Sequence, residues 1–213
     1  MNKTISITGK GFLNVTPDQA RIAFKLSNHQ WKYEQVLKAI NQEVNKLKSV
    51  CSESNIPSDD LKSKAFNITK DDHYDKETED YIFNGYIAEH RMELKLPLDN
   101  QLIGKLLETI SQSFENLNFN ISFGIKDQRS CEKQLLKSAV EDAKNNALIL
   151  SEAAGVDLGE IINIDYSFSE IEFSSSMRYD TMSDYCLSEA SIPDFNPDDI
   201  ELNKNVSFIW AIK

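Results

Sequence analysis

Histidines are the side chains of this 213-residue chain best suited to acid–base or metal chemistry, and there are three: His29, His73 and His90. No two of them lie four residues apart on a predicted helix, which is the spacing that zinc enzymes use. His90 alternates with Ala88 and Met92 on a predicted strand, so we expect a hydrogen-bonded, partly buried imidazole. Catalysis by a serine–histidine or cysteine–histidine pair stays open, because such groups meet only in the fold. The sequence contains no GxSxG motif.

A run of acidic residues around His73 is a second candidate for a metal site. Its carboxylates could bind Ca²⁺, but the run lacks the glycine at the sixth position and the glutamate at the twelfth that an EF-hand loop requires. We therefore expect a solvated hairpin tip, with no metal and no other cofactor. Elemental analysis of the purified protein should find no stoichiometric transition metal. The run comprises Asp71, Asp72, Asp75, Glu77, Glu79 and Asp80.

Two glycine pairs could suggest a phosphate-binding loop. Such a loop needs its glycines before a helix, where free N–H groups and the positive end of the helix dipole lie. Gly155 and Gly159 come after a predicted helix, so we expect Gly155 to end that helix in the left-handed conformation. Gly9 and Gly11 follow a predicted strand and precede strand-like and turn residues, which indicates a bulge or a tight bend.

Three helices are predicted from apolar spacing. The first begins near Tyr33 and ends before Asn55, and the second is capped by Asp99. The third runs over residues 130–154. Its expected buried face comprises Leu136, Val140, Ala143, Ala147, Leu150 and Ala154.

Alternating apolar residues predict the strands that these helices must cover. Residues 61–69 and 81–96 should form a long hairpin, with the acidic run between its strands. The pattern predicts an α+β fold in which two long helices and one shorter helix pack on an antiparallel sheet. No tandem repeat or flexible linker is visible, so we expect one domain over residues 1–213. The other predicted strands are residues 4–8, 22–27, 119–123, 161–173 and 206–210.

The charge balance narrows the class of partner. The chain has 34 acidic against 23 basic residues, a formal net charge of −11, which disfavours binding to nucleic acid or to anionic membranes. Cys51, Cys131 and Cys186 are odd in number and widely spaced, so we expect free thiols. No apolar run resembles a signal peptide or a membrane span. We expect a cytoplasmic protein as the sequence stands, or an exported one if a leader has been removed.

Four stretches together resemble the SIMPL-domain family, which includes bacterial oxidative-stress-defence and periplasmic immunogenic proteins. The most specific parts are the glycine strand that leads to Pro17-Asp18-x-Ala20, the Gly85-Tyr86-x-Ala88 strand, and the Ala139-Val140-x-Asp142-Ala143 helix that ends in Gly155. The resemblance implies helices on an antiparallel sheet, ring-like oligomers in some relatives, and no established active site. The stretches are ISITGKGFLNVTPDQARIAFKLS, NGYIAEHRMELKLPLDNQLIGKLLETI, ISFGIKDQ and SAVEDAKNNALILSEAAGVDLGEIINI.

An acidic insertion at about residues 174–199 lacks a sustained hydrophobic period. One interpretation is a passive acidic loop; the other is a segment whose apolar side chains bind another subunit or a partner. Deleting residues 175–191 should then leave the fold intact but lower the mass in solution or abolish partner binding. The candidate partner-binding residues are Met177, Tyr179, Met182, Tyr185 and Leu187.

These observations favour a non-enzymatic SIMPL-domain protein. We expect it to act by self-association as a homo-oligomer or by binding a protein partner, with a role in bacterial stress protection. The alternative is a small-molecule or peptide binding module, which an apolar pocket with convergent polar groups would favour. The weakest alternative is a hydrolase, which a nucleophile within hydrogen-bond reach of His29 or His90 would favour.

Overall fold

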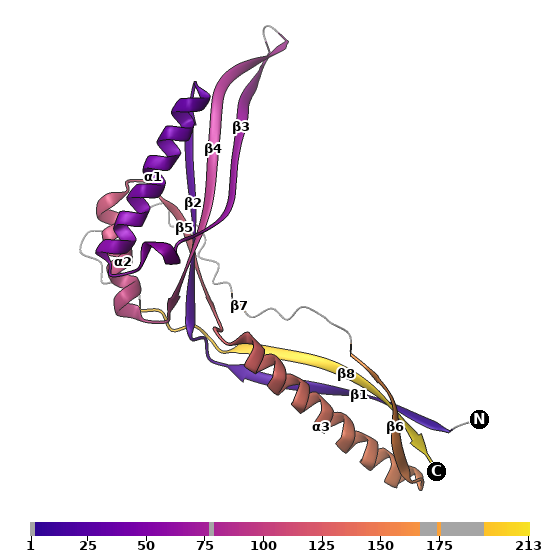
Figure 1. Ribbon diagram of the computed structural model, residues 1–213. Helices are drawn as coiled ribbons and strands as arrows, with labels where there is room; N and C mark the ends of the chain where they lie inside the picture. The colour runs from indigo at the N-terminus through magenta and orange to yellow at the C-terminus, as the bar shows by residue number, and fades with distance from the viewer. Residues whose placement is uncertain (1–2, 77–78, 167–173, 176–193) are drawn as a thin grey trace. The chain divides into compact units, whose positions relative to one another are not determined.

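The computed structural model describes residues 3–76, 79–166, 174–175 and 194–213 (Figure 1). The chain divides into two compact units. Residues 1–18, 124–175 and 197–213 make the terminal unit, and residues 19–123 and 176–196 make the central unit. Helices pack on antiparallel sheets, so the predicted α+β class is confirmed, and the strands that we expected in one sheet are divided between two.

The terminal unit is a three-stranded sheet with one long helix. Its strands are β1 (Thr4–Val15), β8 (Ile200–Ile212) and β6 (Leu158–Asp165), in the order β1-β8-β6. Helix α3 (Gln128–Ala154) packs on one face, as Figure 1 shows. Ile7 lies opposite Phe208 in the register, and both side chains are buried under the helix. Every second residue of these strands faces α3, which explains why apolar and polar residues alternate in their sequences.

Gly9 and Gly11 allow α3 to approach the sheet closely. The predicted bulge or tight bend is wrong, since β1 continues through both glycines and pairs with β8 without a register shift. A Cβ on Gly9 would lie 2.0 Å from the carbonyl oxygen of Ala139, and one on Gly11 would lie 2.1 Å from that of Leu135. The glycines are therefore needed for contact between helix and strand backbones.

The buried face of α3 differs from the predicted one. Ala143 and Ala147 are buried as expected, but Val140, Leu150 and Ala154 are exposed. Alanines occupy most of the line along which α3 approaches β1, and Leu135 is buried with Ile200 and Leu202 toward the start of the helix. The helix ends at Gly155 with φ 66°, as predicted. The buried residues of α3 are Cys131, Leu135, Ala139, Ala143, Ala147 and Ser151.

The central unit places two helices on one face of a second sheet (Figure 1). Four of that sheet's strands lie in this unit, in the order β3-β4-β2-β5. The core between sheet and helices includes Phe24, Ile40 and Leu106. The elements are β2 (Gln19–Gln30), α1 (Tyr33–Glu53), the short 3₁₀ helix η1 (Ser58–Asp60), β3 (Lys62–Asp75), β4 (Asp80–Pro97), α2 (Asn100–Ser113) and β5 (Asn118–Gly124); β7 is the two-residue strand Ser174–Ser175.

Local signals at the helix ends are confirmed. Asp99 caps α2, since its carboxylate accepts hydrogen bonds from the backbone N–H groups of Gln101 at 2.9 Å and Leu102 at 3.2 Å. Asn55 follows α1 with φ 62°, the left-handed conformation that asparagine tolerates. The β3–β4 hairpin is longer than predicted, because β3 continues through Asp75 and pairs there with Asp80.

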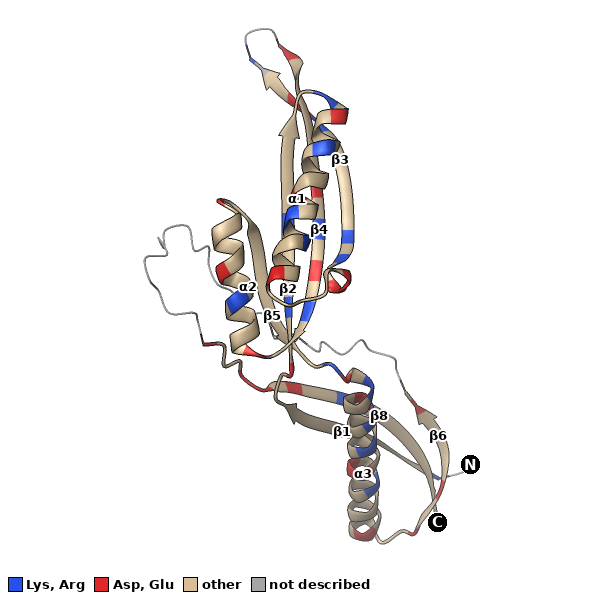
Figure 2. Ribbon diagram, turned by 60° about the vertical axis from the view of Figure 1, so that its left-hand side comes forward, with Lys and Arg blue, Asp and Glu red and all other residues tan. Residues whose placement is uncertain are grey.

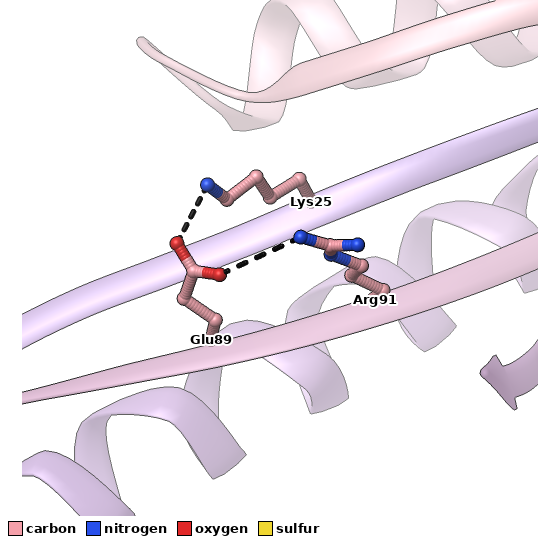
Figure 3. Close-up of polar contacts among 3 residues, drawn as sticks. All are labelled: Lys25, Glu89 and Arg91. Carbon is pink, nitrogen blue, oxygen red and sulfur yellow. Dashed lines mark ion pairs between the residues drawn. The ribbon is translucent and has the colours of Figure 1, made fainter. Parts of the chain in front are cut away.

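The face of the central sheet away from its helices carries ion pairs. Glu89 lies between Lys25 at 2.6 Å and Arg91 at 4.0 Å, measured between side-chain nitrogen and oxygen (Figure 3). The hydrogen bond from Lys25 holds the pKa of Glu89 below its usual value, and the two positive charges act in the same direction. Mixed charges make this face suited to contact with water.

Several predictions fall on residues outside the described part of the chain. These include Cys186 and the five candidate partner-binding residues Met177, Tyr179, Met182, Tyr185 and Leu187. Within the insertion at about residues 174–199, the described Phe195 is buried in the central unit and packs against Phe123 with ring centroids 5.7 Å apart. No helix in the described residues combines the length and apolar character that crossing a bilayer requires.

Candidate functional site

His29 takes part in a polar cluster at a β-bulge. Its Nε2 lies 3.3 Å from Oδ2 of Asp71, and the same oxygen accepts a hydrogen bond from Nδ2 of Asn84 at 2.6 Å. The ladder between β3 and β4 shifts register beside Asp71, and Gly85 there has φ 118°. The cluster ties the end of β2 to the hairpin, and no described hydroxyl or thiol is hydrogen-bonded to His29. The cluster holds the backbones of β2 and the hairpin in place, and its three side chains include no nucleophilic hydroxyl or thiol.

His90 forms the one histidine–hydroxyl pair seen in the described residues. Its Nε2 lies 2.8 Å from Oγ of Ser63, which stands beside a second register shift in the β3–β4 ladder. Desolvation, reinforced by the positive charge of Lys48, lowers the pKa of His90. A neutral imidazole can accept the proton of a serine hydroxyl, so the pair has the chemistry of a nucleophile and its base. The predicted hydrogen-bonded, partly buried imidazole is confirmed.

The surroundings of Ser63 supply few of the other parts of a hydrolase. The ring of Phe66 packs edge-on against His90 with centroids 5.3 Å apart, and no described carboxylate is hydrogen-bonded to the second ring nitrogen. Two hollows among the described residues have volumes of about 630 Å³ along α3 and about 390 Å³ along α1. Each is lined by residues of a single helix, and neither is lined by Ser63 or His90.

His73 and its acidic neighbours lie mainly on strands rather than in a loop. His73 pairs with Ile82 across the hairpin, and Asp72 pairs with Phe83. Among the described residues, no group of three histidine, cysteine or acidic side chains is arranged to hold a metal ion. Asp71 is engaged by His29 and Asn84, so this carboxylate has a structural role.

Two buried thiols are unsuited to act as nucleophiles. Cys51 lies on the buried face of α1, and burial raises the pKa of its thiol to about 11. The pKa of Cys131 is also raised, first by desolvation and then by the negative charges of Asp127 and Asp18. Both cysteines are free, as the sequence predicted.

Aromatic residues form an exposed strip along the β3–β4 hairpin that the sequence analysis did not identify. The rings of Tyr33 and Tyr86 lie 5.7 Å apart, those of Tyr86 and Phe83 5.2 Å, and those of Phe83 and Trp31 6.1 Å. Tyr74 and Tyr81 pair 5.3 Å apart further along the hairpin. The available signal was the group of aromatic residues just after the acidic run, at Tyr81, Phe83 and Tyr86. We call Trp31, Tyr33, Tyr74, Tyr81, Phe83 and Tyr86 the aromatic strip.

The edge strand β6 exposes apolar side chains in the terminal unit. Ile161, Ile162 and Ile164 are each about half exposed, although β6 is paired with β8 along one side. The end of the strand is fixed by Tyr166, whose hydroxyl donates to Oε1 of Glu132 at 3.1 Å. Desolvation, followed by this hydrogen bond, raises the pKa of Tyr166. We call the three isoleucines the β6 edge.

Comparison with known proteins places this chain in a family but not in a reaction class. No curated protein matches the chain. The sequence model of one family, described as SIMPL: Protein of unknown function (DUF541), matches residues 5–210. That range includes the β6 edge, the aromatic strip and the Ser63–His90 pair. Because the match covers nearly the whole length, the chain belongs to the SIMPL (DUF541) family.

Proposed function

We propose that this protein acts by self-association through the β6 edge rather than by catalysis. The observation that carries the proposal is the outer edge of β6, which pairs with no further described strand and carries three half-exposed isoleucines. Unpaired backbone groups and apolar side chains on one edge are a template for strand pairing, and proteins usually cover or charge such edges. A role in stress protection is part of the proposal, supported by the resemblance to oxidative-stress-defence proteins.

A second copy of the same chain fits this edge by symmetry. Antiparallel pairing of β6 with β6 of another copy brings identical patches together, as in a two-fold interface. Such pairing would satisfy backbone groups and bury isoleucine side chains at once. Glu160 and Asp165 flank the isoleucines, so their repulsion should weaken as salt is added. Association is therefore expected to strengthen with ionic strength.

Light scattering coupled to size exclusion tests the proposal by measuring the mass in solution. Ile162→Lys places a charge on the edge, and we expect it to lower the mass to that of the monomer. Ile149→Lys is a matched control, since Ile149 is 62% exposed on α3 and Ile162 is 52% exposed on β6. Wild-type protein that stays monomeric at high salt, or an Ile162→Lys variant with unchanged mass, would refute self-association through this edge.

A hydrolase is the second candidate, because the Ser63–His90 pair is the feature that would favour one. In such a reaction, His90 would take the proton of Ser63 while Oγ bonds to the acyl carbon of an ester, and the alcohol would leave with that proton as its bond to the acyl carbon breaks. Water, deprotonated by His90, would then attack the acyl-serine and release the acid, and the proton would return to Oγ. A fluorophosphonate probe labels activated serines, so labelling that is lost in Ser63→Ala would support this candidate. We expect no labelling, because no described carboxylate is hydrogen-bonded to His90 and neither of the two hollows on α3 and α1 is lined by Ser63.

A further inference from the structure

The β3–β4 hairpin extends beyond the strand that supports it. Pairing between β2 and β4 ends at Gln30 and Tyr86, whereas pairing between β3 and β4 continues to Asp75 and Asp80 (Figure 1). The part of β4 before Tyr86 is therefore paired only with β3. A two-stranded ribbon has little core of its own, so aromatic pairs across it must supply much of its stability.

The aromatic strip lies along this ribbon and leaves much of its apolar surface exposed to solvent. Tyr81 and Phe83 are two residues apart on β4, so both point to the face where Tyr81 meets Tyr74 and Phe83 meets Tyr86. Trp31 joins the same chain of rings from the end of β2. Trp31 is 62% exposed and Tyr81 is 70% exposed. Large aromatic side chains left open to solvent in a row are typical of a binding surface.

Acidic side chains toward the outer end of the hairpin favour a cationic ligand there, whereas Lys70 lies opposite Tyr86 at the other end of the strip. Asp72 lies opposite Phe83 in the register, and Glu79 and Asp80 lie at the hairpin end beside Tyr81. Figure 2 shows acidic residues near this end of β3 and β4. Guanidinium groups stack on aromatic rings and form paired hydrogen bonds with carboxylates, so arginine satisfies both features at once. The same negative charge disfavours nucleic acid.

The outer edge of β3, which pairs with no other described strand, suits an extended peptide as the ligand. β3 is the outer strand in the order β3-β4-β2-β5, and its described side chains are mostly exposed from Lys62 to Tyr74. A peptide added along this edge would bond to the β3 backbone and direct every second side chain toward the aromatic strip. We propose that the β3–β4 hairpin binds an extended segment of a basic protein partner, with arginines at alternate positions.

Fluorescence anisotropy with the full-length protein tests this proposal. The probe is a labelled peptide of about ten residues that alternates arginine with threonine. We expect saturable binding that weakens when salt is added and when arginine is replaced by lysine. Trp31→Ala together with Tyr81→Ala should weaken binding about tenfold, the effect of two exposed cation–π contacts. Phe12→Ala is the matched control, because Phe12 is a 56% exposed ring on β1 of the other unit.

Further variants separate the parts of the argument. Asp72→Asn with Asp80→Asn should weaken binding and reduce its salt dependence. The peptide can be methylated on alternate backbone nitrogens, at either the odd or the even positions. The version whose methylated nitrogens face β3 should bind poorly, because it cannot donate hydrogen bonds to the β3 backbone. Equal binding by the aromatic variant and wild type, or an equal loss in Phe12→Ala, would overturn the proposal. A lower solution mass in the aromatic variant without peptide binding by wild type would also overturn it, because the strip would then join copies of this chain.

The proposal is independent of self-association through the β6 edge. Ile162→Lys should bind the arginine peptide as wild type does, since Ile162 belongs to the terminal unit and the strip to the central unit. Loss of peptide binding in Ile162→Lys would overturn the assignment of the site to the hairpin. Failure of self-association alone would leave peptide binding unchanged.

Discussion

Gly9→Ala adds one methyl group where the backbone of α3 leaves no room. The new Cβ would lie 2.0 Å from the carbonyl oxygen of Ala139 and 2.6 Å from the Cβ of Ala143, whereas ordinary contact begins at 3.4 Å. A backbone atom is the main obstacle, so no change of rotamer can relieve the clash, and α3 must move away from β1. Overpacking of this kind typically lowers the free energy of unfolding by about 1–3 kcal/mol, and we expect about 3 kcal/mol here.

Gly155→Ala is the control, because it makes the same chemical change without a clash. No atom lies within 4 Å of the position that its Cβ would take, and only the left-handed φ of 66° opposes alanine. That conformation costs about 1 kcal/mol for a residue with a Cβ. Urea unfolding can be followed by the fluorescence of Trp210, which is buried beside Phe208 in the terminal unit, after Trp31→Phe removes the other tryptophan. If Gly9→Ala destabilises no more than Gly155→Ala, the close approach of α3 and β1 is refuted.

Two further predictions concern a helix cap and a buried thiol. Asp99→Ala should lower the free energy of unfolding by about 1 kcal/mol, because two N–H groups of α2 lose their acceptor, and Asp99→Asn should restore most of it; urea midpoints of the two variants measure the difference. Burial raises the pKa of Cys51 from 9.0 to about 11, so between these pH values the thiol ionises in the unfolded chain but not in the folded one. The contribution of this thiol to the free energy of unfolding is therefore complete below pH 9 and is lost as the pH rises toward 11. Cys51→Ala should show a smaller loss of stability between pH 9 and 11 than wild type, and equal losses would contradict the assignment.

Local chemistry explains which parts of the fold could be predicted from the sequence. The cap at Asp99, the end of α1 before Asn55 and the stop at Gly155 depend on neighbouring residues alone, and all three were predicted. The helices and strands follow from apolar periodicity, which is also local. The two-unit arrangement has no such signal, because each unit is assembled from segments that are separate in the sequence.

Contacts between distant segments explain the errors. The role of Gly9 depends on its contact with Ala139, which is distant in the sequence. The buried face of α3 differs from the predicted one because the glycines of β1 let the helix lie close to the sheet. The hairpin was predicted too short because its acidic composition concealed the pairing of Tyr74 with Tyr81. Composition reflects the strand propensities of single residues, which are low for acidic residues. Contacts between aromatic rings on paired strands can stabilise a two-stranded ribbon in spite of these propensities.

Candidate sites were harder to predict than the fold for the same reason. Ser63 and His90 are 27 positions apart and meet only because β3 and β4 are neighbours. The aromatic strip draws residues from the end of β2, the start of α1 and both strands of the hairpin. No periodicity within one segment could reveal either grouping. A prediction of the β3–β4 register would have been the minimum needed to find them.

The residues that identify the SIMPL family in this chain have structural roles. Asp18 donates its backbone N–H to the carbonyl oxygen of Gly124 at 3.1 Å, and its carboxylate accepts from the N–H of Lys126 at 2.7 Å, so it joins the segments where the chain leaves and re-enters the terminal unit. Gly9 and Ala139 permit close packing of α3 on β1. The strongest sequence signals therefore specify the scaffold. The β6 edge and the aromatic strip take no part in these contacts, so residues there can change while the fold is kept.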